Sequence, residues 1–173
     1  MFEVGDYIIY GSSGVCKITN VGPMKISGVS KDKLYYTMIP CYIRDSEIFT
    51  PIDNERVVMR RVMSKDEAED FMSSVSDIDE LEIIEEKKRE LEYKQAVLTC
   101  KPEVLVGLLK TIQTRIDERT AEGKKVTSSD AKYFRIAEDN LFGELAISLD
   151  MEKDDVKEYF ERFLQTEETK LSD

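Results

Sequence analysis

The chain changes its character within the stretch Met59-Arg60-Arg61-Val62-Met63-Ser64-Lys65-Asp66-Glu67. Before this stretch the apolar residues follow the alternating pattern of strands, and after it they recur at the spacing of helices. Ser64 and Glu67 have the spacing of a capping box, in which each side chain accepts the other residue's backbone N–H at the start of a helix. We therefore expect an α+β chain with two domains, residues 1–63 and residues 64–173.

Five short runs of β-branched and aromatic residues precede this boundary, and turns that contain glycine or proline separate them. The runs cover residues 7–10, 15–18, 34–39, 48–50 and 57–59. Five strands in so short a segment predict a compact curled sheet, a small β-barrel of the Tudor or SH3 kind. The glycine-rich turn Gly11-Ser12-Ser13-Gly14 lacks the lysine of a phosphate-binding loop and lies between two strands, so we expect a hairpin turn there.

The second region predicts about five helices, each with one apolar stripe, which together form a small all-helical bundle. The first helix begins at the capping box, the second covers about residues 78–98, and Pro102 lies in the first turn of the third. Thr127 or Ser128 caps the fourth helix, and Asp150 opens the fifth. Aromatic residues at helical spacing are expected mostly in the core: Tyr133, Phe134, Phe142, Tyr159, Phe160 and Phe163.

The composition excludes several classes of function. The chain of 173 residues contains no histidine, which removes Ser-His, Cys-His and His-zinc chemistry. Its three cysteines are far apart and form no C-x-x-C motif, so we expect reduced thiols in a cytoplasmic protein. No apolar stretch reaches the roughly 18 residues of a membrane span, and the N-terminus does not resemble a signal peptide.

Acidic clusters carry no recognisable catalytic or metal-binding pattern. The pairs Glu85-Glu86 and Asp154-Asp155 fall on faces that we expect to be solvated, without the apolar surroundings that raise the pKa of a catalytic acid. The cluster Asp77-x-Asp79-Glu80 lacks the central glycine and final glutamate of an EF-hand loop. We therefore expect no catalytic residues, metal ligands, cofactor or small-molecule substrate.

Charge is distributed unevenly along the chain. Residues 1–63 carry eight Lys/Arg against seven Asp/Glu, whereas residues 64–173 carry 17 against 29. Within the acidic second region, residues 87–135 form a basic island with 12 bases against seven acids. Such an island binds phosphates if its bases converge. It is otherwise a mixed surface of helical ion pairs such as Glu86 with Arg89 or Glu90 with Lys94.

Several motifs occur in a specific order along both regions. Phe2-x-Val4-Gly5-Asp6-Tyr7-Ile8-Ile9-Tyr10 is followed by Gly14-Val15-x-x-Ile18, and the second region contains Leu141-x-Gly143-Glu144-Leu145-Ala146. Together they resemble the CarD family of bacterial transcription regulators over about residues 1–165. Further motifs that contribute to the resemblance are Tyr35-Tyr36, Ile48-x-x-Pro51, Met59-Arg60-Arg61-Val62-Met63-Ser64 and Val126-Thr127-x-x-Asp130.

The resemblance implies a non-enzymatic regulator whose Tudor-like domain binds the β subunit of RNA polymerase. The same module occurs in the transcription-repair coupling factor. The helical domain would stabilise the promoter open complex through weak, largely sequence-independent DNA contacts. By this resemblance the polymerase-binding residues are Met24, Lys25, Ile26, Ile48, Phe49, Thr50 and Pro51. The densest bases of the helical domain give the expected DNA-binding residues: Lys87, Lys88, Arg89, Lys132 and Arg135.

The sequence departs from the family pattern at positions that concern DNA. The family usually has a tryptophan before a basic stretch, but this chain has no tryptophan, and Glu86 precedes Lys87-Lys88-Arg89. Phe49 stands where an arginine often precedes the strand-end proline. These departures leave a second hypothesis open, a polymerase-binding or other interaction adaptor whose acidic helical domain does not touch DNA.

Overall fold

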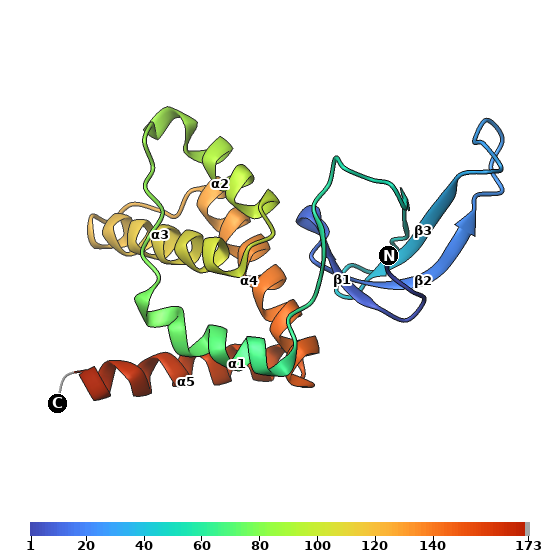
Figure 1. Ribbon diagram of the computed structural model, residues 1–173. Coiled ribbons are helices and arrows are strands. Elements are labelled where there is room, and N and C mark those ends of the chain that lie inside the picture. Colours follow the sequence, from blue (N-terminus) through green and yellow to red (C-terminus); the bar gives the residue numbers. More distant parts are fainter. Residues whose placement is uncertain (172–173) are drawn as a thin grey trace.

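The computed structural model describes residues 1–171, and its side chains as far as residue 162. Figure 1 shows a sheet on one side of the molecule and a group of helices on the other, which confirms the predicted α+β class. The five strands, all antiparallel to their neighbours, are β1 (Tyr7–Tyr10), β2 (Val15–Pro23), β3 (Leu34–Pro40), β4 (Ile48–Pro51) and β5 (Met59–Arg61). The five α-helices are α1 (Lys65–Ser74), α2 (Arg89–Leu98), α3 (Pro102–Ala121), α4 (Ser128–Leu149) and α5 (Lys153–Leu171).

The sheet is open rather than closed into a hydrogen-bonded barrel. Its strand order is β4-β3-β2-β1-β5, so β4 and β5 are the two edges and do not pair with each other. Both edges are short, with four residues in β4 and three in β5. A register shift between Ile18 and Asn20 in β2 bends the sheet, and one face encloses a core of Ile8, Cys16, Ile18, Tyr36 and Met38.

The expected hairpin turn at residues 11–14 is present. Residues Gly11–Ser13 form a short 3-10 turn between β1 and β2, and Tyr10 donates its backbone N–H to the Gly14 carbonyl at 3.0 Å. The last strand begins two residues later than the sequence predicted, at Met59. Val57 belongs instead to the preceding turn, where its carbonyl accepts from the Asn54 side-chain amide at 2.8 Å and its N–H donates to Asn54 Oδ1 at 3.3 Å.

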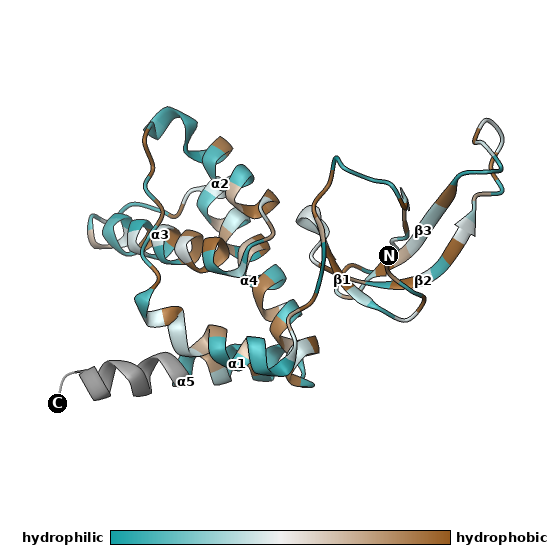
Figure 2. Ribbon diagram, in the orientation of Figure 1, coloured by the Kyte–Doolittle hydropathy of each residue, from teal (hydrophilic) through white to brown (hydrophobic). Residues whose placement is uncertain are grey.

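The capping box at the start of α1 is confirmed. Glu67 donates its N–H to Ser64 Oγ at 3.2 Å, and the Glu67 carboxylate accepts the N–H of Ser64 at 2.8 Å. Pro102 opens α3 and Thr127 caps α4, as expected. Figure 2 shows hydrophobic segments along α3 and α4, which contribute much of the helical core. The completely buried residues of this core include Ala68, Tyr93, Leu108, Ile112, Ala137, Leu141, Leu145 and Val156.

The sequence prediction of a helix over residues 78–98 is wrong in its first part. Helix α2 begins at Arg89, after a 3-10 turn at Glu86–Lys88, and residues 78–85 are extended. In this segment Leu81 donates its N–H to Thr111 Oγ1 at 2.8 Å, and Leu81 and Ile83 pack against the helical core while their neighbours Glu82 and Ile84 are exposed. The alternation of inward and outward residues belongs to an extended chain lying on α3.

Two smaller expectations about the helices also change. Asp150 does not open α5 but ends α4 in the left-handed conformation, with φ of 52°. Among the aromatic residues expected in the core, Tyr133, Phe142 and Phe160 are buried and Phe134 is half-buried, whereas Tyr159 is 42% exposed. The side chain of Phe163 lies outside the described residues.

The two domains contact each other at one end of the sheet. Ile9, Val15 and Cys100 form a small buried cluster that Val62 and Ile147 extend. A glycine allows a close contact here: a Cβ at Gly143 of α4 would lie 2.8 Å from Cε2 of Tyr42 in the sheet domain, so a side chain at this position would displace the Tyr42 ring.

Candidate protein-docking and nucleic-acid interfaces

Strand β4 presents an open edge. It pairs with β3 on one side, and no strand of the described chain pairs with its other side. Its side chains alternate: Ile48 packs against the sheet core and Thr50 is 3% exposed, whereas Phe49 is 44% exposed. An edge strand with free backbone groups and a large apolar side chain is a natural docking element for another protein.

Phe49 belongs to a larger apolar surface on the outer face of the sheet. Phe49 is opposite Thr37 and Pro51 is opposite Tyr35, so these four residues share one face. Ile39, two residues beyond Thr37, lies on the same face and is 44% exposed. We call these five residues the outer face of β3–β4. The sequence analysis missed Ile39, because a strand pattern alone does not say which face another domain covers.

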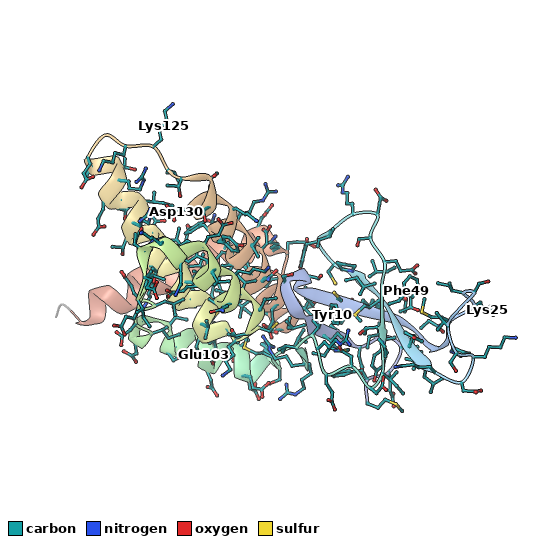
Figure 3. The ribbon with its side chains drawn as sticks, turned by 90° about the horizontal axis from the view of Figure 1, so that it is seen from above. Tyr10, Lys25, Phe49, Glu103, Lys125 and Asp130 are labelled. Atoms are coloured by element: carbon teal, nitrogen blue, oxygen red, sulfur yellow. The ribbon has the colours of Figure 1, made fainter. Side chains whose placement is uncertain are left out.

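The loop between β2 and β3 lies at the same end of the sheet. Pro23 pairs with Leu34 at the base of the loop, and the Leu34 carbonyl accepts the N–H of Ile52, the residue after β4. Within the loop Met24 is half-buried, and Lys25 and Ile26 are exposed. Figure 3 shows Lys25 at the end of the sheet far from the helices, with Phe49 on the same part of the molecule. The structure thus brings the two groups of expected polymerase-binding residues to one region.

The basic end of the helical domain is built around a network of five side chains. Arg89 forms a two-pronged ion pair with Glu86, with nitrogen–oxygen distances of 2.9 and 2.5 Å. Glu86 also accepts from Arg115 at 2.6 Å, and Arg115 donates to Asp130 at 2.9 Å. Tyr93 closes the network: its hydroxyl accepts from Arg89 and donates to Asp130, both at 3.0 Å. Segments from η3 (Glu86–Lys88), α2, α3 and α4 are joined in this way.

The network stabilises the ionised form of its acids. Hydrogen bonds from Arg89 lower the pKa of Glu86 to about 2, and Arg115 contributes to the same shift. Burial alone would raise the pKa of Asp130, which is completely buried, but hydrogen bonding with Thr127, Arg115 and Tyr93 lowers it overall. Asp130 therefore anchors the start of α4 to α2 and α3 as a paired charge.

The sheet domain matches a known family of domains: the family described as "CarD-like/TRCF RID domain" matches residues 2–63. Residues 2–63 form a CarD-like/TRCF RID domain. The match covers all five strands and ends before α1, so the helical domain lies outside it. No curated protein matched the chain. The open edge of β4 and the outer face of β3–β4 are thus surfaces of the RID domain.

The expected DNA-binding residues of the helical domain differ in whether their charges are already paired within the domain. Lys87 is exposed and makes no ion pair within the described residues. Lys88 pairs with Glu85 at 2.7 Å, and Arg135, whose side chain is 84% exposed, lies 3.7 Å from Asp139. The ammonium group of Lys132 lies 5.0 Å from the centre of the Tyr133 ring.

The fifth of these residues, Arg89, is held inside the network by Glu86 and Tyr93. Its guanidinium group joins η3 to α2 through these hydrogen bonds, and its side chain is only 18% exposed. Glu86, which occupies the position of the tryptophan in the family resemblance, is the acid that holds it. The expected pair of Glu90 with Lys94 does not form in the described part of the chain.

The network brings the other bases to the same end of the molecule. Lys87 and Lys88 directly follow Glu86, and Lys132 lies two residues after Asp130. Because Arg115 bridges Glu86 and Asp130, η3 and the first turn of α4 are adjacent. Figure 3 shows Asp130 and the loop residue Lys125 at the end of the helical domain that lies away from the sheet.

The described residues contain no cluster of three or more potential metal-binding side chains. None of the helices described is both long and apolar enough to cross a membrane. Cys16, Cys41 and Cys100 are free thiols, and burial raises the pKa of Cys16 to about 12, so this thiol is a poor nucleophile.

Proposed function

We propose that the protein is a non-enzymatic bacterial transcription regulator that binds the β subunit of RNA polymerase through its RID domain. The observation that carries this proposal is the family match over residues 2–63. The open edge of β4 supports it, because the exposed Phe49 lies beside backbone groups that are free to pair with a partner strand.

In this proposal the docking surface combines the outer face of β3–β4 with the loop that contains Met24, Lys25 and Ile26. Phe49 is its apolar centre, and Ile48, Thr50 and Pro51 set its position by holding β4 in the sheet. Large apolar side chains at the centre of an interface contribute most to affinity, which makes Phe49 the residue to test first.

The helical domain would then contact promoter DNA through Lys87, Lys88, Lys132 and Arg135, with Arg89 holding the segment that carries two of them. Such contacts to phosphates fix position without reading sequence. The domain as a whole is acidic, so its affinity for DNA on its own would be low. Binding to polymerase would keep the domain near the DNA at a high effective concentration, and the weak contact would then prolong the open complex.

The second candidate is an adaptor that binds polymerase but whose helical domain does not touch DNA. The observation that favours it is the pairing of Lys88, Arg89 and Arg135 with acids of the same domain. A duplex would have to compete with these acids for the bases.

The experiment that tests polymerase binding is the substitution Phe49→Glu in the full chain. A charge placed at the centre of the docking surface would be buried without a partner, so we expect affinity for polymerase to fall by about 30-fold or more, equivalent to about 2 kcal/mol. Affinity is measured by titration with purified polymerase, and circular dichroism checks the fold. Val58→Glu is the matched control, because Val58 is 45% exposed but precedes β5 at the opposite edge of the sheet. Equal affinity of folded Phe49→Glu and parent protein would contradict the proposed surface.

A further inference from the structure

Two distant motifs of the sequence meet at the contact between the domains. Arg60 of β5 lies opposite Glu144 of α4, 84 residues later in the chain. The two guanidinium nitrogens of Arg60 donate to the two carboxylate oxygens of Glu144 at 2.6 and 2.7 Å. Arg60 lies in β5, the last strand before the domain boundary at Ser64, and Glu144 lies in the Gly143-Glu144 motif of the helical domain.

The pair is enclosed and connected to more than two elements. The side chain of Glu144 is 1% exposed and that of Arg60 is 28% exposed. Glu144 also accepts the backbone N–H of Met63 at 3.0 Å, and Nε of Arg60 donates to the carbonyl of Cys100 at 2.8 Å. One ion pair therefore joins β5, the link to α1, the turn before α3, and α4. A buried carboxylate with these partners has one favourable position, because moving α4 relative to β5 would leave the charge of Glu144 or Arg60 without its partner.

The rest of the contact between the domains is mostly apolar. Two further hydrogen bonds cross it: Cys100 Sγ donates to the Gly11 carbonyl at 3.3 Å, and Asn140 Nδ2 donates to the Ser12 carbonyl at 3.5 Å. Both are longer than the bonds of the ion pair and join neutral groups, so they are weaker. The cluster of Ile9, Val15 and Cys100 is apolar, and apolar packing alone tolerates small rotations better than a two-pronged ion pair does. The neighbouring pair of Arg61 with Glu67 has the same two-pronged geometry at 2.6 Å, but its side chains are 64% and 47% exposed. Exposed pairs contribute little, so this neighbour provides a natural comparison.

A small rotation of the helical domain would move the bases at its far end by several ångström. Glu144 and Lys132 lie on the same helix, 12 residues apart, which corresponds to about 18 Å along α4. A rotation of about 20° around Glu144 would therefore move Lys132 by about 6 Å, more than the roughly 4 Å within which an ammonium group and an anionic oxygen form an ion pair.

We propose that Arg60 and Glu144 are positioning residues that hold the helical domain in one orientation relative to the RID domain, so that polymerase and DNA can be contacted at the same time. This inference rests on the proposed function for its consequence on DNA, but not for its structural part. Neither residue belongs to the proposed docking surface or to the proposed DNA contact. Both act through the geometry of the contact between the domains.

The first test measures how the free protein tumbles, by ¹⁵N NMR relaxation. We expect the parent chain to tumble as one body and Glu144→Gln to show two rotational correlation times, with loss of the nuclear Overhauser effects between Tyr42 and Gly143. Glu67→Gln is the matched control and should tumble like the parent. A single correlation time and intact Tyr42–Gly143 effects in Glu144→Gln would overturn the proposal.

Arg60→Lys covers the case in which Glu144→Gln does not fold. It keeps the positive charge but removes the two-pronged geometry and the bond to Cys100, so we expect domain motion between that of the parent and that of separate bodies. Parent-like tumbling of Arg60→Lys would then overturn the proposal.

The second test measures polymerase affinity and open-complex lifetime separately. In a variant whose domains move independently, we expect most of the increase in open-complex lifetime that the parent protein causes to be lost. Its affinity for polymerase should stay equal to that of the parent. An unchanged lifetime in a variant with two correlation times would overturn the positioning role. If the parent chain itself fails to bind polymerase, the proposed function is wrong, and the tumbling of the free protein still decides the role of the pair.

Discussion

Glu144, Asp130 and Glu86 show how strongly single carboxylates of this chain depend on distant partners. Glu144 and Asp130 are completely buried, and each is paired with an arginine from another element. Glu86 is exposed for most of its side chain, yet two arginines donate to it. Removing the arginine or the carboxylate from such a pair leaves the other charge uncompensated. These acids therefore fix how their elements are placed relative to one another more than they add to stability.

Glu86 gives a prediction about pH. Because its pKa in the folded protein is about 2, below the ordinary value of about 4.3, the stabilisation that it provides is complete above the ordinary pKa and is lost as the pH falls toward 2. Carbon-detected NMR of the glutamate carboxyl groups should show this low midpoint. Arg89→Gln should raise the midpoint of Glu86 toward the ordinary value, because Arg89 is the main cause of the shift. The pKa of Glu67, which Arg61 lowers to about 2, is the internal control and should not move. An unchanged Glu86 midpoint in Arg89→Gln would contradict the network.

Of these partnerships, the sequence suggested only the pair of Glu86 with Arg89, which the structure confirms. Arg60 and Glu144 are far apart in the chain, and a glutamate in the middle of a helix is ordinarily expected on a solvated face. The motifs that contain them were visible, but only the packing of the domains shows that they meet. The sequence did place Lys87, Lys88 and Lys132 in one basic island, but it could not show that Tyr93 and Arg115 join the pair of Glu86 with Arg89.

At the scale of elements, local signals were predictive and non-local ones were not. The capping box of α1, the proline at the start of α3 and the cap of α4 depend on residues within one turn, and all three are confirmed. The segment of residues 78–85 was predicted as helix, but its conformation depends on Thr111, about 30 residues away. Its tertiary contacts with α3 override the local preference.

Thr111→Val tests how this extended segment is held. The substitution keeps the shape of the side chain but removes the oxygen that accepts the N–H of Leu81, leaving that group without its partner. We expect the free energy of unfolding to fall by about 1–3 kcal/mol, and amide exchange over residues 78–85 to become faster. Chemical denaturation and hydrogen exchange measure the two effects. Thr114→Val is the matched control: Thr114 lies one turn further along α3, and its hydroxyl bonds the exposed Glu80 of the same segment. Equal effects of the two substitutions would show that the Leu81 contact is not the anchor.

At the scale of the whole molecule, the two candidate surfaces lie at opposite ends. Phe49 and the β2–β3 loop residue Lys25 lie on the part of the sheet away from the helices, and Asp130 and Lys125 lie at the end of the helical domain away from the sheet (Figure 3). A chain built in this way can contact two partners at once, provided that the two domains keep a fixed orientation relative to each other. The boundary between the two expected domains is also structured: Met63 and the capping box hold the chain near Ser64. We therefore expect a protease to cleave the loop at residues 122–127 more readily than the boundary.

The last prediction separates the DNA-contacting regulator from the adaptor. Reversing the charges of Lys87, Lys88 and Lys132 together to glutamate leaves the Glu86 network with its arginines and replaces three of the bases that would face phosphates. A phosphate that no lysine neutralises keeps its condensed counterion, so the salt dependence of the lifetime should become weaker as the lifetime itself shortens. Open-complex lifetime is measured at several salt concentrations, and polymerase affinity is measured separately and should not change.

The control for this prediction carries the same change in charge on other surfaces, with Arg44, Arg56 and Lys65 reversed to glutamate. A general electrostatic repulsion between an acidic protein and DNA would shorten the lifetime equally in both variants, whereas a local contact shortens it only in the first. If lifetime and its salt dependence stay the same when Lys87, Lys88 and Lys132 are reversed, the helical domain does not work through DNA. Its acidic surface would then meet another protein, and the adaptor hypothesis would replace the proposed contact.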